Sequence, residues 1–350
     1  MTTPLREASA LETDGARVPM RLAIVLLLVL GVVGARAQTP LPDGLAASRD
    51  LRGPYRAALC ARAALAAEDC GRSLLTFAGE AAAPRPAPAV PNEYRLLFVP
   101  GFLAACFPGI HSFSDVIEAA RDEGFAAETL AVGGRNGVAA NARLLAEQVD
   151  RLPADGRRLV FVGHSKGVAD ILEMLGSRPD IAARTQGVLS IAGAVNGSPL
   201  ADTFRGFYAS TVGVLPFRGC DRGEGDPVGD LTPAARKTWW ASPQARSGVP
   251  VYSVVTMPDL GGLSPGMLLP YLRLARTEGR NDGMLLVRDQ VAPGGTLLGV
   301  VDADHLRVAI PFPGAPFVLL FSAEPFPRAA MVLAAVDVMA AAAPQTAGLR

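Results

Sequence analysis

A serine between two glycines, placed at the end of a short apolar run, constrains the fold of this chain more than any other feature. Residues 160–167 read Val-Phe-Val-Gly-His-Ser-Lys-Gly. The apolar residues at 160–162 predict a buried strand, and apolar positions at helical spacing over 168–175 predict a helix directly after it. The G-x-S-x-G pattern is typical of a tight strand-to-helix turn with a serine at its apex, where glycines let neighbouring backbone approach closely.

Apolar runs alternate with helical patterns through most of the chain. This alternation predicts an α/β fold with a mostly parallel sheet covered by helices on both faces. The expected strands are 94–99, 128–132, 158–162, 187–191, 251–256 and 297–301, and the expected helices include 115–123, capped by Ser114, and 138–152. Roughly sixty residues rich in Gly, Pro, Phe and Trp separate the strands at 187–191 and 251–256, which is too long for a plain connection. An inserted lid or cap is therefore expected at about 202–248.

The chain before the first of these strands divides into two parts. Residues 38–80 contain alanine-rich stretches that predict a helical segment, and residues 81–91 contain four prolines that predict an extended linker. We therefore expect a helical N-terminal segment and linker over 38–91, followed by the main domain over 92–350.

Composition and charge exclude several classes of protein. Half of the 350 residues are hydrophobic, which excludes disorder of the whole chain. The 33 basic and 33 acidic residues give a formal net charge of zero. The chain therefore lacks the excess of positive charge that is typical of nucleic-acid-binding proteins. No cysteine pair has the spacing of a zinc site, and neither a metal nor a cofactor is expected. The oligomeric state stays open.

The first 37 residues have the pattern of a secretory signal peptide. Arg21 is followed by an apolar run at 22–33 and by an Ala-Arg-Ala cleavage site that ends at Ala37. The run is shorter than the about 20 residues of a transmembrane helix. Met20 directly precedes Arg21, which suggests that translation begins there. We expect a secreted or periplasmic protein, with an uncleaved N-terminal membrane anchor as the alternative.

Export changes the interpretation of the four cysteines. In an oxidising compartment two disulfides are expected. Cys60 and Cys70 are close in sequence, and a disulfide between them would link the two helices of a hairpin. A disulfide between Cys106 and Cys220 would link the loop after the first core strand to the inserted segment. Buried free thiols are the alternative.

A serine hydroxyl is a weak nucleophile and needs a base, normally a histidine that a carboxylate orients. The chain has three histidines. His164 adjoins Ser165, but the turn projects its ring away from the serine hydroxyl. His111 lies near the first core loop, whereas His305 follows the last expected strand. His305 is therefore the predicted base.

Two aspartates between the serine and the histidine are candidates for the acid. Asp259 follows the strand at 251–256 by three residues, whereas Asp282 stands in an Asn-Asp-Gly turn about two dozen residues before His305. This turn and the apolar residues after it resemble the acid loop of bacterial triacylglycerol lipases. The Gly-Ser-x-x-Ala-Asp segment at 197–202 is similar to one that such lipases carry. Asp282 is favoured, and Asp259 stays the alternative acid.

As a whole, the chain resembles the α/β-hydrolase superfamily over about residues 94–342, and its lipase-like members more loosely. The resemblance implies an α/β-hydrolase fold and an oxyanion hole made of two backbone N–H groups. One N–H belongs to Lys166, after the serine. The other belongs to Phe102, in a loop where Pro100 replaces the histidine of the usual His-Gly-x motif.

These features predict a secreted serine ester hydrolase, a lipase or carboxylesterase that forms an acyl-enzyme on Ser165. Its expected partners are an ester or lipid substrate and a lipid interface. Aromatic and apolar residues of the insertion supply either a lid over an acyl pocket or the core of an inserted subdomain: Phe204, Phe207, Tyr208, Leu215, Phe217, Trp239 and Trp240. Two alternatives use the same fold: an acyltransferase with the same triad, and a catalytically silent binding protein.

Overall fold

The computed structural model describes residues 39–46, 48–63, 73–107, 109–211, 213, 216, 220–311 and 326–342. They belong to one compact unit that begins at Thr39. The predicted signal peptide over 1–37, with its start at Met20 and its cleavage site at Ala37, lies outside the described residues. Within the described part of the chain, no helix is both long and apolar enough to cross a membrane.

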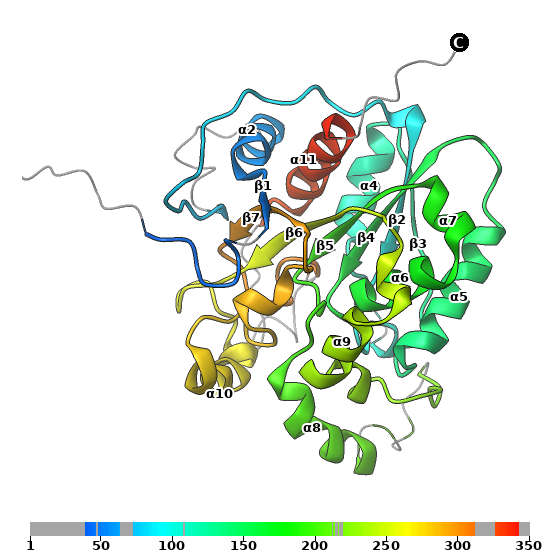
Figure 1. Ribbon diagram of the computed structural model, residues 1–350, viewed down its shortest axis with the longest axis vertical. Helices are drawn as coiled ribbons and strands as arrows, with labels where there is room; N and C mark the ends of the chain where they lie inside the picture. The colour runs from blue at the N-terminus through cyan, green and yellow to red at the C-terminus, as the bar shows by residue number, and fades with distance from the viewer. Residues whose placement is uncertain are drawn as a thin grey trace, which may run out of the picture. The chain divides into compact units, whose positions relative to one another are not determined.

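Seven strands form one sheet in which every neighbouring pair is parallel (Figure 1). Their order across the sheet is β1-β7-β6-β5-β4-β2-β3. The strands are β1 (Arg49–Asp50), β2 (Tyr94–Val99), β3 (Ala126–Thr129), β4 (Arg158–His164), β5 (Thr185–Ile191), β6 (Val251–Thr256) and β7 (Thr296–Val301). The parallel sheet that the apolar runs predict is confirmed, because strands buried on both faces are apolar nearly throughout.

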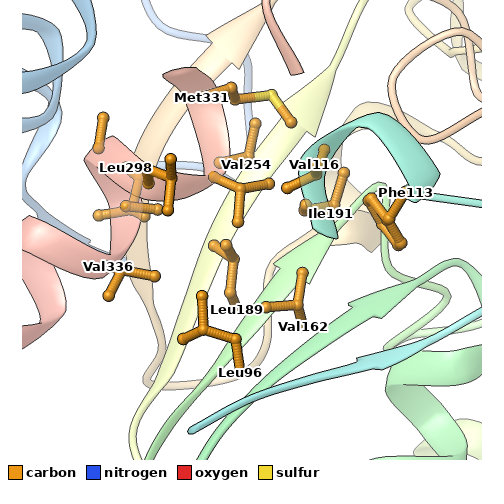
Figure 2. Close-up of a cluster of buried hydrophobic side chains, with 14 of the residues drawn as sticks. Leu96, Phe113, Val116, Val162, Leu189, Ile191, Val254, Leu298, Met331 and Val336 are labelled. Carbon is orange, nitrogen blue, oxygen red and sulfur yellow. The ribbon is translucent and has the colours of Figure 1, made fainter. Parts of the chain in front are cut away.

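Helices cover both faces of this sheet (Figure 1). They are α2 (Arg52–Arg62), α4 (Ser114–Asp122), α5 (Val138–Asp150), α6 (Lys166–Ser177), α7 (Pro179–Arg184), α8 (Pro199–Ser210), α9 (Pro233–Trp240), α10 (Leu268–Glu278) and α11 (Arg328–Ala341). One core joins the sheet to α2, α4 and α11, and a second joins it to α5, α6 and α7. Alternate residues of a strand enter opposite cores, as Leu96 and Leu97 do. Figure 2 shows part of the first core, where Val336 and Met331 of α11 lie over strand residues such as Val254.

The core begins earlier in the chain than the apolar strands indicate. β1 pairs with β7, and α2 packs against α11. Tyr55 of α2 is fully buried, and its hydroxyl donates a hydrogen bond to the carbonyl oxygen of Met331 at 3.2 Å. The expected boundary at residue 92 therefore separates no compact unit. Residues 81–90 contain no helix or strand, and Pro91 begins a short 3-10 helix, Pro91–Glu93.

Several element ends differ from the sequence prediction by a few residues, and two of the differences have a visible cause. β3 ends at Thr129, because its pairing with β2 runs only over Ala126–Thr129. The apolar residues after it, Leu130 and Val132, are buried in the second core without joining the sheet. Ser114 is the first residue of α4 rather than its cap, because Phe113 takes the cap position with a φ of 62°.

The inserted segment between β5 and β6 contains α8 and α9. The predicted disulfide between Cys106 and Cys220 is present, with the two Cα atoms 4.6 Å apart, and it ties this segment to the loop after β2. Cys60 is also disulfide-bonded. Its predicted partner, Cys70, lies outside the described residues.

Candidate active site

Ser165 stands at the apex of the turn between β4 and α6. Its φ of 53° and ψ of −124° are strained for a residue with a side chain. The flanking glycines are required by close contacts. A Cβ atom at Gly163 would lie 3.0 Å from the Cα of Val168, and one at Gly167 would lie 2.5 Å from the carbonyl oxygen of Val99. The G-x-S-x-G pattern therefore has a steric cause on both sides of the serine.

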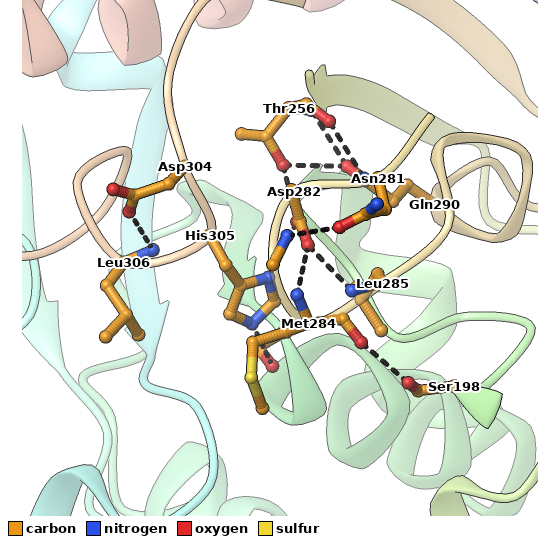
Figure 3. A network of polar contacts seen from close by, with 12 residues as sticks. Ser198, Thr256, Asn281, Asp282, Met284, Leu285, Gln290, Asp304, His305 and Leu306 are labelled. Carbon is orange, nitrogen blue, oxygen red and sulfur yellow. Dashed lines mark hydrogen bonds and ion pairs between the residues drawn. The ribbon is translucent and has the colours of Figure 1, made fainter. Parts of the chain in front are cut away.

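Two loops far along the chain bring a histidine and an aspartate to this serine. His305 lies in the loop after β7, and its Nε2 is 2.8 Å from the Ser165 Oγ. Its Nδ1 is 2.8 Å from the Oδ2 of Asp282, which lies in the loop after α10 (Figure 3). Both side chains are buried. The structure thus brings together the serine, base and acid predicted from the sequence.

Hydrogen bonds surround the Asp282 carboxylate on both of its oxygens. Oδ1 accepts from the backbone N–H groups of Met284 and Leu285 at 2.8 and 2.7 Å. Oδ2 accepts from the hydroxyl of Thr256 at 2.7 Å, in addition to His305. Burial acts to raise the pKa of Asp282, but its interactions with His305 and Thr256 outweigh burial and hold this pKa below its ordinary value. The carboxylate is therefore ionised at neutral pH.

Gln290 fixes the threonine that supports this carboxylate. Its side-chain oxygen accepts from the Thr256 N–H at 2.8 Å, and its side-chain nitrogen donates to the Thr256 carbonyl at 3.0 Å (Figure 3). Both residues are fully buried. The sequence carries no local signal for this role, because Gln290 and Thr256 meet only through the packing of separate segments.

His164 contacts the backbone of His305. Its ring is buried, and its Nε2 lies 2.7 Å from the carbonyl oxygen of His305. Burial, with a smaller contribution from His305, lowers the pKa of His164 to about 3. The ring is therefore neutral at neutral pH, and its Nε2–H donates to the carbonyl. The sequence excludes His164 as the base but does not predict this contact.

The other candidate residues lie apart from the triad. Asp259 is exposed, and its Oδ1 accepts from the Gly262 N–H at 2.7 Å. His111 is exposed at the surface. Asp304, next to His305 in sequence, is fully buried, and its Oδ1 accepts from the N–H groups of Leu306 and Arg307 in the turn that carries His305.

The side chain of Lys166 is buried in an ion pair. Its Nζ lies 2.6 Å from Asp170 Oδ1, and each side chain is 2% exposed. The other Asp170 oxygen accepts from the side-chain amide of Asn141 at 2.8 Å. Burial raises the pKa of Asp170, and Lys166 opposes this rise. The unusual lysine after the serine thus satisfies a buried carboxylate between α5 and α6.

This buried pair is connected to the loop that carries the predicted oxyanion donor. Asn141 Oδ1 accepts from the Gly133 N–H at 2.9 Å, and the next carbonyl, that of Gly134, accepts from the Leu103 N–H at 3.0 Å. Leu103 directly follows Phe102 and has a left-handed φ of 60°. A continuous set of contacts therefore joins α6, which begins at Lys166, to the Phe102 loop.

A pocket of about 770 Å³ opens over Ser165. Phe102 and Leu103 line one part of it, and α8 and α10 form its walls. The residues that line it are Phe102, Leu103, Ser165, Ala194, Ser198, Leu200, Ala201, Thr203, Phe204, Val228, Leu231, Leu269, Pro270, Leu272, Arg273, Arg276, Met284 and Leu285. Most of these side chains are apolar, which suits an acyl chain.

The aromatic residues of the inserted segment divide between two roles. Phe204 lines the pocket, and buried Tyr208 packs on Phe102 with ring centroids 5.4 Å apart. Trp239 and Trp240 instead pack against the second core. Leu215 and Phe217 lie outside the described residues.

The part that α10 takes in the pocket is absent from the sequence prediction. Leu269, Leu272, Arg273 and Arg276 recur at the spacing of one helix face, which is the signal that could have indicated it. In the part of the chain that the structure describes, no group of three or more His, Cys, Asp or Glu side chains could hold a metal ion.

Solved structures resemble this chain, although no family model and no curated protein matches it. The metagenomic carboxyl esterase MGS0156 is 35% identical, with a TM-score of 0.79, over 90% of this chain and 98% of the esterase. The Bacillus licheniformis lipase BlEst2 in its propeptide form is 18% identical, with a TM-score of 0.51, over 63% of this chain and 48% of the lipase, and shows the fold alone.

The parallel sheet, the serine turn and the likeness to the esterase define the class of protein. The chain belongs to the α/β-hydrolase superfamily, and within it to the lipase- and esterase-like members. The resemblance predicted from its motifs is thereby confirmed.

Proposed function

We propose that this protein is a serine hydrolase of carboxylic esters. The observation that carries the proposal is the hydrogen-bonded chain from Ser165 through His305 to Asp282, at the floor of a largely apolar pocket. The carboxyl esterase that covers 90% of this chain at 35% identity supports the same activity.

In the first step, the Ser165 oxygen attacks the carbonyl carbon of the ester while His305 Nε2 takes the hydroxyl proton. The carbonyl oxygen becomes an oxyanion, which accepts hydrogen bonds from the backbone N–H groups of Phe102 and Lys166. The intermediate then breaks its bond to the alcohol oxygen, and His305 returns the proton to the departing alcohol. An acyl-enzyme on Ser165 is left.

In the second step, His305 takes a proton from water, whose oxygen attacks the acyl carbon. Collapse of this intermediate breaks the bond to Ser165, and His305 returns the proton to the serine oxygen. Asp282 stays ionised throughout and holds the Nδ1–H tautomer, so that Nε2 is free to accept. The bond from His164 to the His305 carbonyl keeps the ring at the serine while its charge changes.

Replacement of the nucleophile tests the proposal. Ser165→Ala should lower kcat for p-nitrophenyl esters by on the order of 10⁴–10⁶-fold, because the covalent step is lost. Ser177→Ala, at an exposed position of the same helix, is the matched control and should stay near wild type. Turnover by Ser165→Ala within tenfold of wild type would contradict the proposal. Product analysis with an added alcohol separates hydrolysis from acyl transfer.

Export completes the proposed function. The disulfide between Cys106 and Cys220 suits an oxidising compartment, and so does the predicted signal peptide. N-terminal sequencing of the native product should read from Gln38. A mature chain that begins elsewhere would contradict the predicted cleavage.

A further inference from the structure

We propose that the natural ester carries a negatively charged group, a carboxylate or a phosphate, which Arg273 and Arg276 bind at the α10 wall of the pocket. The inference rests on the proposed function and names the substrate class of the same site. The two arginines thereby determine specificity and take no part in the chemical steps.

The charge of the pocket lining is the first observation. Arg273 and Arg276 are its charged residues, and no aspartate or glutamate belongs to it. The chain as a whole is balanced, with 33 basic and 33 acidic residues, so its net charge does not attract an anion. An anion at this wall is therefore attracted by two positive charges, and none of the residues that line the pocket is a carboxylate.

The second observation is that both guanidinium groups are available. Among the described residues, neither Arg273 nor Arg276 forms an ion pair or hydrogen bond through its side chain. Other arginines of the chain are engaged in ion pairs, as Arg178 is with Asp150 and Asp180, so the distinguishing feature of Arg273 and Arg276 is that they are available in the pocket lining. A guanidinium group offers a planar fork of donors that fits a carboxylate or phosphate with two parallel hydrogen bonds.

The third observation concerns the geometry of α10. Arg273 and Arg276 are three residues apart and therefore neighbours on one helix face. Leu269 and Leu272 line the pocket beside them and are 79% and 47% exposed. The α10 wall therefore places two leucine side chains beside two positively charged arginine side chains. An ester with an apolar chain and an anionic terminus matches it, with the carbonyl at Ser165.

Two p-nitrophenyl esters of equal chain length provide the test: the neutral hexanoate and the mono-ester of hexanedioate, which ends in a carboxylate. The measured quantity is the ratio of kcat/KM for the anionic ester to kcat/KM for the neutral one. The double variant Arg273→Gln/Arg276→Gln should lower this ratio about three- to tenfold, because exposed ion pairs contribute modestly. Raising the salt concentration should lower the wild-type ratio in the same direction.

A second double variant controls for the loss of two positive charges. Arg85→Gln/Arg246→Gln removes two exposed arginines that do not line the pocket and should leave the ratio unchanged. An unchanged ratio in the Arg273→Gln/Arg276→Gln variant, or an equal fall in the control pair, would overturn the proposal.

Binding without turnover separates this proposal from the proposed function. Calorimetry with monomethyl hexanedioate and the Ser165→Ala variant should give binding that weakens about three- to tenfold when Arg273 and Arg276 are also changed to Gln. If wild type hydrolyses neither ester but this weakening is observed, the anion site stands and the ester hydrolase fails. If both esters are hydrolysed and no weakening is observed, only the anion site fails.

Discussion

The floor and the walls of this pocket are built in different ways. At the floor, Asp282 and His305 are buried, and hydrogen bonds from separate segments fix each of them. The walls expose apolar side chains, among them Leu269 and Leu272 of α10 at 79% and 47%. The positions of Ser165, His305 and Asp282 therefore depend on many coupled contacts, whereas few contacts restrain the exposed residues of the walls. We therefore expect substitutions in α10 to alter substrate choice more than the chemistry at the floor.

The largest expected effect is the loss of the acid at the floor. Asp282→Asn should lower kcat by about 10⁴-fold, because an amide cannot hold the His305 tautomer that leaves Nε2 free. Steady-state kinetics with a short p-nitrophenyl ester measures this. Asp259→Asn is the control and should stay within about twofold of wild type, since Asp259 contacts neither Ser165 nor His305 in the structure. The reverse pattern would make Asp259 the acid.

A buried ion pair provides the next test. Lys166→Met should lower the free energy of unfolding by about 3–5 kcal/mol, because it leaves Asp170 buried without its partner charge. The control, Arg143→Met, breaks an exposed pair with Glu224 and should cost about 0–1 kcal/mol. Urea unfolding measures both values. Equal losses of unfolding free energy in the two variants would contradict a larger contribution from the buried ion pair.

The buried imidazole of His164 predicts a dependence of stability on pH. Its pKa is about 3 in the folded protein against 6.5 for an ordinary histidine, so the unfolded chain binds the proton first. As the pH falls from 6.5 towards 3, this group should remove about 3–5 kcal/mol from the free energy of unfolding.

His164→Gln isolates that contribution, because glutamine can donate to the His305 carbonyl but does not titrate. The difference in the free energy of unfolding between wild type and variant should shift in favour of the variant as the pH falls through this range. A difference independent of pH would contradict a neutral, buried His164.

A substitution in the pocket wall should have the smallest effect on stability and on activity. Leu269→Ala should alter the free energy of unfolding by no more than about 0.5 kcal/mol, because the side chain is mostly exposed. It should lower kcat/KM about two- to fivefold for acyl chains of six or more carbons and leave the acetate unaffected, since an acetyl group does not reach α10. Leu144→Ala, on α5 outside the pocket, is the control. A large loss of stability at Leu269 would give the walls a structural role.

Features with a local physical cause could be predicted from the sequence. β2 and β6 agree with their predicted ranges because strands buried on both faces are unbroken apolar runs. The serine turn is visible because close backbone contacts require Gly163 and Gly167. The triad residues could be proposed because three histidines leave His305 alone in a suitable place.

Features that depend on long-range packing could not be predicted. β1 has two residues, Arg49 and Asp50, and no apolar run to mark it. Lys166 and Asp170 have the i,i+4 spacing of a pair on one helix, but their burial depends on the packing of α5 on α6, which brings Asn141 to Asp170. The leucines of α10 have a helical spacing, but spacing does not distinguish a pocket wall from a core.

Labelling with a fluorophosphonate probe tests the central claim most directly, because the probe reacts covalently with a serine that a base activates. Peptide mass spectrometry after labelling should find one phosphonyl group on Ser165 in wild type. The Asp282→Asn variant should label far more slowly, and Ser165→Ala should not label. A wild-type protein that stays unlabelled, or one labelled at another residue, would contradict Ser165 as the nucleophile.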